Sequence, residues 1–341
     1  MGRRDKRYHK DLHQQAYEKM QSMLEIGESR HLAKKEDRKN DTDVVRGKIY
    51  GLNTYKQYWR HTKQYLGWIS KEHPECTTIK KAQKYVPEYL QSRVDQKLSA
   101  STIHTQEAAL NKLFGITPND PKRFVPPRRN KEDIKRSRVP AERDQHFSIE
   151  KNIELINFCR GCGFRRGVLE NLQGKDLYSR KRVQEALEAA KTQNNKMMVE
   201  ACVNALKTFP TQDYYILHYK DKNGKTRISP IVGPHKNEIV ARMQATGSNE
   251  KVWDKVNSNC DVHSYRSDYA TYIYEQYARP IEELRYENKI RCADGKYRSE
   301  IYVSRGVDKG KKLDRIAVRT VAMALGHGRE DTAIANYIKF N

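Results

Sequence analysis

A basic, proline-rich segment divides this sequence into two parts and limits the folds open to it. Residues 117–146 hold five prolines and nine lysines or arginines. Proline interrupts helices and strands, and the charges disfavour burial in a core, so the segment is predicted to be a linker. The 341 residues suffice for two domains at about 100–200 residues each. We therefore expect one domain over 46–116 and another over 147–341.

The N-terminal part is predicted to be a charged arm followed by a small helical domain. Residues 1–45 are rich in charged and amide side chains, so we expect a basic N-terminal arm, with one helix that Gly27 could end. Residues 46–116 show apolar stripes at helical spacing. Thr54 and Ser101 are candidate N-caps, and Pro87 suits the first turn of a helix.

The charge of the chain points to a polyanionic partner. Lysine and arginine number 66 against 43 aspartates and glutamates, a net charge of +23. Nucleic acid is the commonest partner of so basic a protein, and an anionic membrane surface is the rival. The candidate DNA-binding residues lie between the apolar stripes and in the linker: Lys56, Arg60, Lys63, Lys80, Lys81, Lys84, Arg128 and Arg129. Solvated helix faces carry such charges too, so these residues alone are weak indicators.

The sequence has no apolar run long enough for a transmembrane helix and no secretory signal at its start. We expect a cytoplasmic protein in a reducing, DNA-containing compartment, with its six cysteines as thiols. Cys159 and Cys162 form a CxxC, but no second CxxC or histidine pair follows at ligand spacing. The pair is interpreted as thiols on a helix face near the core, and we expect neither a metal nor a cofactor.

The C-terminal part is predicted to be mainly α-helical with a small antiparallel β-sheet. Residues 148–208 favour helices, whereas 214–219 and 227–232 have the composition of strands. The turn between them, Asp221-Lys222-Asn223-Gly224, is typical of a hairpin. The remainder is predicted to be helical except for a Lys/Gly-rich stretch at 291–312.

Four separated motifs in this part carry residues suited to phosphodiester chemistry. They are Gly163-Phe164-Arg165-Arg166, the turn lysine Lys222, the run from His263 to Arg266, and Leu325-Gly326-His327 with Tyr337 beyond it. Phosphodiester cleavage without a metal needs cations for the extra negative charge, a base for the nucleophile and an acid for the leaving oxygen. A tyrosine nucleophile keeps the bond energy in a phosphodiester, so the strand can be rejoined. The candidate catalytic residues are Tyr337, Arg165, Lys222, His263, Arg266 and His327.

These motifs resemble those of the tyrosine recombinases, or phage integrases. The family's H-x-L-R-H-x-x-A-T box is similar to the nine residues from His263 to Thr271, and its first box is matched from Gly163 to Leu177. Its K-x-R-x-x-P-I pattern after the turn lysine resembles Lys225 to Ile231, and its L-G-H box with a later T and Y matches Leu325-Gly326-His327, Thr332 and Tyr337. The resemblance covers about residues 148–341. A weaker one, to the family's helical core-binding domain, covers about 46–116.

The chain departs from the family pattern in several places. Arg166, which has Glu170 one turn on, is an alternative to Arg165, although Leu172 and Asp176 keep register with Arg165. Lys220 or Lys225 could take the place of Lys222. The spacing from His327 to Tyr337 is one residue longer than usual. Two insertions are predicted, a helical one between Tyr178 and Phe209 and another at about 280–315.

The resemblance implies a site-specific recombinase that forms a 3′-phosphotyrosyl intermediate without a metal and integrates or excises a mobile element. It further implies a core-binding and a catalytic domain in a C-shaped clamp around duplex DNA, a homotetramer on two recombination sites, and an accessory DNA-bending or directionality factor as a possible partner. A type IB topoisomerase shares this chemistry and is the first rival. A DNA-binding protein that kept the fold without catalysis is the second.

Overall fold

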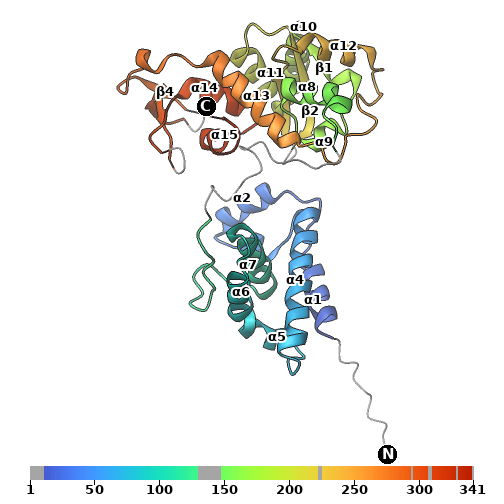
Figure 1. Ribbon diagram of the computed structural model, residues 1–341, viewed down its shortest axis with the longest axis vertical. Coiled ribbons are helices and arrows are strands. Elements are labelled where there is room, and N and C mark those ends of the chain that lie inside the picture. Colours follow the sequence, from blue (N-terminus) through green and yellow to red (C-terminus); the bar gives the residue numbers. More distant parts are fainter. Residues whose placement is uncertain are drawn as a thin grey trace, which may run out of the picture. The chain divides into compact units, whose positions relative to one another are not determined.

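A computed structural model describes residues 11–129, 147–221, 225–292, 295–305, 309–327 and 329–339. The chain splits into two compact units, Met1–Asp133 and Ile134–Asn341, whose helices and strands are shown in Figure 1. The division falls inside the segment predicted to be a linker. Among the helices that the structure describes, none has the length and apolar character needed to cross a membrane.

The first unit is a helical domain built around one core. Its central pair is α4 and α7, which pack together, and α1 and α6 pack against them. The buried side chains include Tyr65, Leu66, Tyr89 and Leu110. Its elements are α1 (Leu12–Gln21), α2 (Arg30–Asn40), α3 (Val44–Gly47), α4 (Leu52–Glu72), α5 (Ile79–Ala82), η1 (Gln83–Tyr85), α6 (Val86–Asp95) and α7 (Ala100–Phe114).

One of the predicted helix-end signals in this unit is confirmed, whereas Gly27 does not end α1, which stops at Gln21, and two predicted caps are wrong. Pro87 is in the first turn of α6, as predicted. The predicted cap Thr54 is wrong, because α4 begins earlier, after Gly51. The predicted cap Ser101 is also wrong: the Ser99 hydroxyl accepts from the Thr102 amide at 3.2 Å and begins α7.

The expectation of an arm over residues 1–45 is wrong for its described portion. Leu12, Ala16 and Met20 lie on one face of α1 and are buried in the core of the first unit. The backbone after α1 is fixed as well, because the Ile49 amide donates to the Met23 carbonyl at 2.7 Å. A single apolar residue per turn is enough to bury one stripe of a helix, so the sparse apolar pattern did not exclude folding.

The first part of the predicted linker packs on the first unit. Arg123 donates through Nε to Oε1 of the nearly buried Glu107 at 2.7 Å, and His104 Nε2 lies 3.1 Å from the Pro127 carbonyl oxygen. Residues 117–129 therefore belong structurally with α7. Residues 130–146 of the linker lie outside the described residues.

A three-stranded antiparallel sheet organises the second unit. Its order is β1 (Leu177–Ser179), β2 (Tyr214–Asp221) and β3 (Lys225–Pro230). The two predicted strands are confirmed, although β3 begins two residues before 227, and β1 was not predicted. Side chains alternate along β2, so that Tyr215 and Leu217 enter one core whereas Ile216 enters another. The sheet therefore separates two cores.

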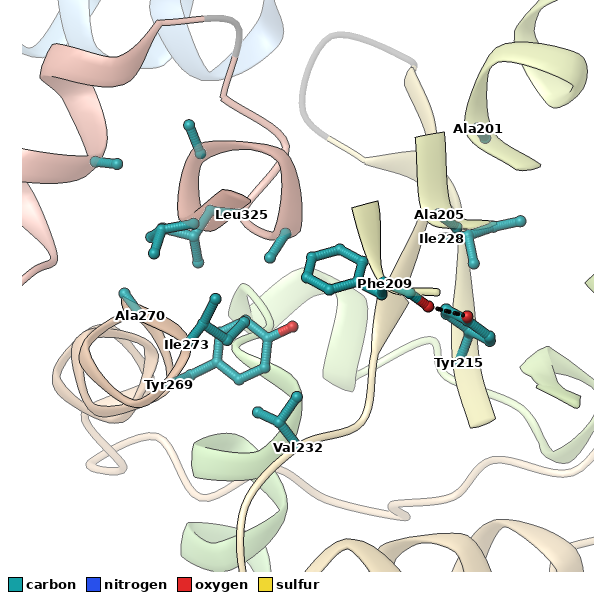
Figure 2. Close-up of a cluster of buried hydrophobic side chains, with 14 of the residues drawn as sticks. Ala201, Ala205, Phe209, Tyr215, Ile228, Val232, Tyr269, Ala270, Ile273 and Leu325 are labelled. Atoms are coloured by element: carbon teal, nitrogen blue, oxygen red, sulfur yellow. Dashed lines mark hydrogen bonds between the residues drawn. The ribbon is translucent and has the colours of Figure 1, made fainter. Parts of the chain in front are cut away.

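Helices cover both sides of this sheet. Figure 2 shows part of one core, where the Tyr215 hydroxyl donates to the Phe209 carbonyl at 2.7 Å and side chains of α11 (Lys196–Thr208), β3 and α13 converge. Cys159 and Cys162 are buried in the other core, on α8, as predicted for thiols on a helix face. The helices are η3 (Glu150–Asn152), α8 (Ile153–Cys162), α9 (Arg166–Leu169), η4 (Gly174–Asp176), α12 (Lys236–Ala245), α13 (Val262–Tyr277), α14 (Arg315–Ala324) and α15 (Glu330–Asn336).

Both predicted insertions contain regular secondary structure. The first is a helical hairpin, α10 (Arg180–Thr192) and α11 (Lys196–Thr208), as predicted. The second holds two small antiparallel ladders that were not predicted. Its elements are η6 (Ile281–Glu283), β4 (Lys289–Arg291) paired with β5 (Tyr297–Ser299), and β6 (Ile301–Val303) paired with β7 (Lys312–Asp314).

Candidate active site

Arg266 is the most deeply buried cation of the second unit's candidate residues. It lies one turn into α13, whose N-cap Asp261 accepts from the Ser264 amide at 3.1 Å. The guanidinium is fully buried and donates to the carbonyls of Gly163 and Leu325, the latter at 2.6 Å. Its Nε has no hydrogen-bond partner within the described part of the chain. Arg266 therefore fastens α13 to the ends of α8 and α14 and retains one unused donor.

The surroundings of Arg266 hold excess positive charge. The pKa of the Arg266 guanidinium is lowered to about 9, first by burial and then by the nearby charges of Arg227 and Arg165, whereas Tyr337 opposes the shift. Burying a cation among like charges is unfavourable until an anion arrives. The cluster of Arg165, Arg227 and Arg266 is thus suited to an anionic group such as a phosphate.

Tyr337 lies against this arginine cluster. It follows the last residue of α15 and is half-buried. The Arg266 guanidinium carbon is 5.1 Å from the centroid of the Tyr337 ring. The His327 ring lies on Tyr337 as well, with 5.3 Å between the ring centroids. Arg266 of α13 and His327 of the turn after α14 therefore both lie against the Tyr337 ring.

The segment around Tyr337 is attached at both ends. Before it, Arg315 of α14 pairs with Glu330 of α15 at 2.9 Å, and both side chains are largely buried. After it, the Lys339 amide donates to Thr271 Oγ1 at 2.9 Å, and Lys339 Nζ pairs with Asp268. Because Thr271 and Asp268 belong to α13, the helix that carries Arg266 also fixes the chain that carries Tyr337.

Gly326 allows the close approach of Arg227 to the turn before His327. Gly326 has φ +69°, and a Cβ there would lie 2.7 Å from Arg227 Cδ. Arg227 Nη1 donates to the Ala324 carbonyl at 2.8 Å, next to the Leu325 carbonyl that Arg266 binds. These carbonyls close the C-terminus of α14, where cations are stabilised by the helix dipole. Two arginines therefore hold the turn that presents His327.

The two alternative arginines have different environments. Arg166 donates to four backbone carbonyls, those of Val256, Asn257, Ser258 and Cys260, at 2.7–3.3 Å. It is therefore occupied in holding the loop before α13. Arg165 is half-buried at the N-cap of α9, and its charge lowers the pKa of Arg266. The arrangement brings Arg165 to the cluster and keeps Arg166 away from it.

Gly163 and Phe164 set the direction of Arg165. Gly163 ends α8 with φ +58°, and a Cβ there would lie 2.2 Å from a ring carbon of Tyr269. Phe164 is fully buried. The next residue in this extended backbone, Arg165, is thereby turned out of the core.

The remaining two candidates are His263 and Lys222. His263 lies in the first turn of α13, one turn before Arg266, as predicted, and its side chain is exposed. Lys222 lies outside the described residues. The side chains of Lys220 and Lys225, its alternatives, lie outside the description too, so the choice among the three stays a prediction.

Two residues of the site were not singled out from the sequence. His218 and Arg227 are paired across β2 and β3, and both are buried. Their hydrogen bond, Arg227 Nη2 to His218 Nδ1, is 3.2 Å long. Arg227 is the arginine of the K-x-R-x-x-P-I pattern, which was a signal in the sequence. His218 had none, because it stands in an ordinary strand pattern.

The described ranges contain no group of three or more His, Cys, Asp or Glu side chains placed to hold a metal ion.

In the first unit, the candidate DNA-binding residues are exposed. Lys56, Arg60 and Lys63 form one stripe along α4, and the others are Lys80, Lys81, Lys84, Arg128 and Arg129. The first unit therefore offers these basic side chains to solvent.

The chain was compared with protein-family models, curated proteins and solved structures. No protein-family model matches the sequence, and no curated protein matches it. Among solved structures, the chain is similar to XerA recombinase at 14% identity, over 92% of both chains, with a TM-score of 0.27. It is similar to the Tn1549 transposon integrase in complex with transposon right end DNA at 11% identity, over 92% of this chain and 95% of that chain, with a TM-score of 0.40.

Proposed function

We propose that this chain is a tyrosine recombinase, an enzyme that cuts and rejoins DNA through Tyr337. The observation that carries the proposal is the contact of the Tyr337 ring with Arg266, which belongs to a cluster of two buried arginines and the half-buried Arg165. A phenol beside cations can attack a phosphate whose charge the cations neutralise. The motif matches of the sequence analysis support the same assignment.

In the proposed reaction, the Tyr337 hydroxyl oxygen attacks the phosphorus of one DNA strand. The bond from phosphorus to the 5′ oxygen breaks, and a 3′-phosphotyrosyl bond forms. The proton of the phenol passes to a base, His263 or His327, and the departing 5′ oxygen receives a proton from Lys222. Attack by a 5′ hydroxyl of another strand reverses these transfers and joins the strands.

The arginines would bind the phosphate in the transition state. Arg266 has an unused buried Nε–H, and an unsatisfied buried donor costs about 1–3 kcal/mol. A nonbridging phosphate oxygen would satisfy it and offset the positive charge of the cluster. Arg165, half-buried at the rim, would bind a second oxygen.

The proposed partner is duplex DNA, and the proposed role is integration or excision of a mobile element by a homotetramer on two sites. The net charge of +23 and the exposed basic stripe of α4 support DNA binding. Phosphate contacts would supply most of the affinity, which should fall steeply with salt. An accessory DNA-bending or directionality factor is part of the same proposal.

The test is covalent trapping on DNA. Duplexes that the full-length protein selects from a random library are nicked so that the short fragment diffuses away after cleavage. We expect a denaturant-resistant protein–DNA band that forms in excess EDTA. Absence of the band, or its strict dependence on added Mg²⁺, would contradict the proposal. Relaxation of a supercoiled plasmid that lacks the selected sequence would instead favour a type IB topoisomerase.

A further inference from the structure

His218 is a buried histidine that contacts Arg227 of the arginine cluster. It is 1% exposed and lies between the Phe164 ring, at 4.3 Å between centroids, and Arg227, whose Nη2 is 3.2 Å from His218 Nδ1. The positive charges of Arg227, Arg266 and Arg165 all lower the pKa of its ring. These neighbours determine the protonation state of the His218 ring.

The contact with Arg227 fixes the tautomer. A guanidinium only donates hydrogen bonds, so Nδ1 must accept and the ring proton must sit on Nε2. Burial lowers the pKa of His218 well below its usual value, and the charges of Arg227, Arg266 and Arg165 lower it further. The ring is therefore a neutral acceptor toward Arg227.

The other end of Arg227 reaches the turn that presents His327. Arg227 Nη1 donates to the Ala324 carbonyl at 2.8 Å, and Gly326 lies against its side chain. The next carbonyl, of Leu325, accepts from Arg266. A continuous path thus runs from His218 through Arg227 to the turn that touches both Arg266 and His327.

We propose that His218 is a positioning residue, which holds Arg227 and through it the turn at 324–327. This inference rests on the proposed function. A neutral acceptor suits the place better than a carboxylate, because a carboxylate would cancel the charge that the cluster offers to a phosphate. An apolar residue would leave Arg227 Nη2 without its buried partner.

Two isosteric substitutions separate the roles of the two ring nitrogens. The Asn side chain places its oxygen near the position of Nδ1, whereas Gln places its polar atoms near Nε2. The rate of covalent complex formation is measured under single-turnover conditions for the wild type, His218→Asn and His218→Gln, on the nicked selected duplex. Melting temperature and DNA affinity of each variant are measured alongside, to separate folding from positioning.

We expect His218→Asn to react within a few-fold of the wild-type rate. His218→Gln should be slower by about 10- to 100-fold, because a misplaced turn costs rate while DNA affinity stays unchanged. The inference is overturned if both variants react like the wild type or if both are equally slow. If the wild type itself forms no covalent complex, the proposed function fails instead.

A second measurement stands apart from activity. In the wild type labelled with ¹⁵N-histidine, the ring nitrogens of His218 are assigned by comparison with His218→Asn. We expect the neutral Nε2–H form, with Nδ1 as acceptor, across neutral and mildly acidic pH. A cationic ring or an Nδ1–H form would overturn the inference even if the kinetics agree.

Discussion

The guanidinium carbon of Arg266 lies 5.1 Å from the centroid of the Tyr337 ring. Both residues are held by the same helix, since α13 carries Arg266 and also binds the backbone of Lys339 through Thr271. The proposed nucleophile and the main cation are therefore positioned by one rigid element.

Arg165 and Arg166 should separate in their effects. Arg165→Ala should slow covalent complex formation by at least about 100-fold with little loss of stability, because it removes a cation for the transition state. Arg166→Ala should lower the free energy of unfolding by about 2–3 kcal/mol, because its hydrogen bonds to the loop before α13 are lost. Urea unfolding and single-turnover cleavage of both variants measure this. The reverse pattern would make Arg166 the catalytic arginine.

Gly326→Ala should slow cleavage in addition to destabilising the protein through its backbone angle. Gly326 has φ +69°, and its new Cβ would lie 2.7 Å from Arg227 Cδ. Gly115→Ala is the matched control, because Gly115 has φ +70° and no heavy atom within 4 Å of the added Cβ. Both should lose about 1–2 kcal/mol of stability from the left-handed backbone. Only Gly326→Ala should also slow cleavage, and equal cleavage rates would show that the contact with Arg227 is unimportant.

The sequence predicted the residue types of the site better than their packing. Arg266, His327 and Tyr337 could be found because each stands in a motif whose order and spacing are visible. The pairing of His218 with Arg227 could not, because it depends on the strand register. An irregularity between His218 and Asp221 shifts that register, and the turn residues do not encode the shift.

The first unit shows the same limit on local signals. Thr54 has the side chain of a cap, yet α4 begins at Leu52, and Tyr55 of its first turn already packs against the core of the first unit. The burial of Leu12, Ala16 and Met20 likewise depends on partners in α4 and α7. A helix with so few apolar residues gains a core only from the rest of the domain.

His218 should make the protein sensitive to mild acid. The pKa of its ring is well below the usual value in the folded state, because of burial and of Arg227, Arg266 and Arg165. Below about pH 6.5 the unfolded chain binds a proton that the folded chain does not, so the free energy of unfolding falls by about 1.4 kcal/mol per pH unit. The loss of unfolding free energy on acidification should be smaller in His218→Asn, which lacks this group. Urea unfolding at about pH 7.5 and about pH 5.5 gives the comparison, and equal losses in both proteins would contradict the assignment.

Lys222→Ala should slow cleavage of a normal DNA strand by about 10²–10⁴-fold, the usual contribution of a general acid. A strand with a 5′-bridging sulfur should restore most of the rate, because a thiolate leaves without protonation. Lys220→Ala and Lys225→Ala are the controls, and Arg266→Ala should stay slow on both strands. If Lys222→Ala is equally slow on both, the lysine binds phosphate instead. If it is fast on both, Lys220 or Lys225 supplies the proton.

The identity of the DNA-linked residue tests the assignment of Tyr337 as the nucleophile most directly. The covalent complex formed in EDTA is digested with trypsin and nuclease, and the peptide that carries the residual nucleotide is sequenced by mass spectrometry. We expect the nucleotide on Tyr337, joined through a 3′-phosphate, and no covalent complex from Tyr337→Phe, which should bind DNA with nearly wild-type affinity. A nucleotide on another residue, or a normal yield of complex from Tyr337→Phe, would contradict the assignment of Tyr337 as the nucleophile.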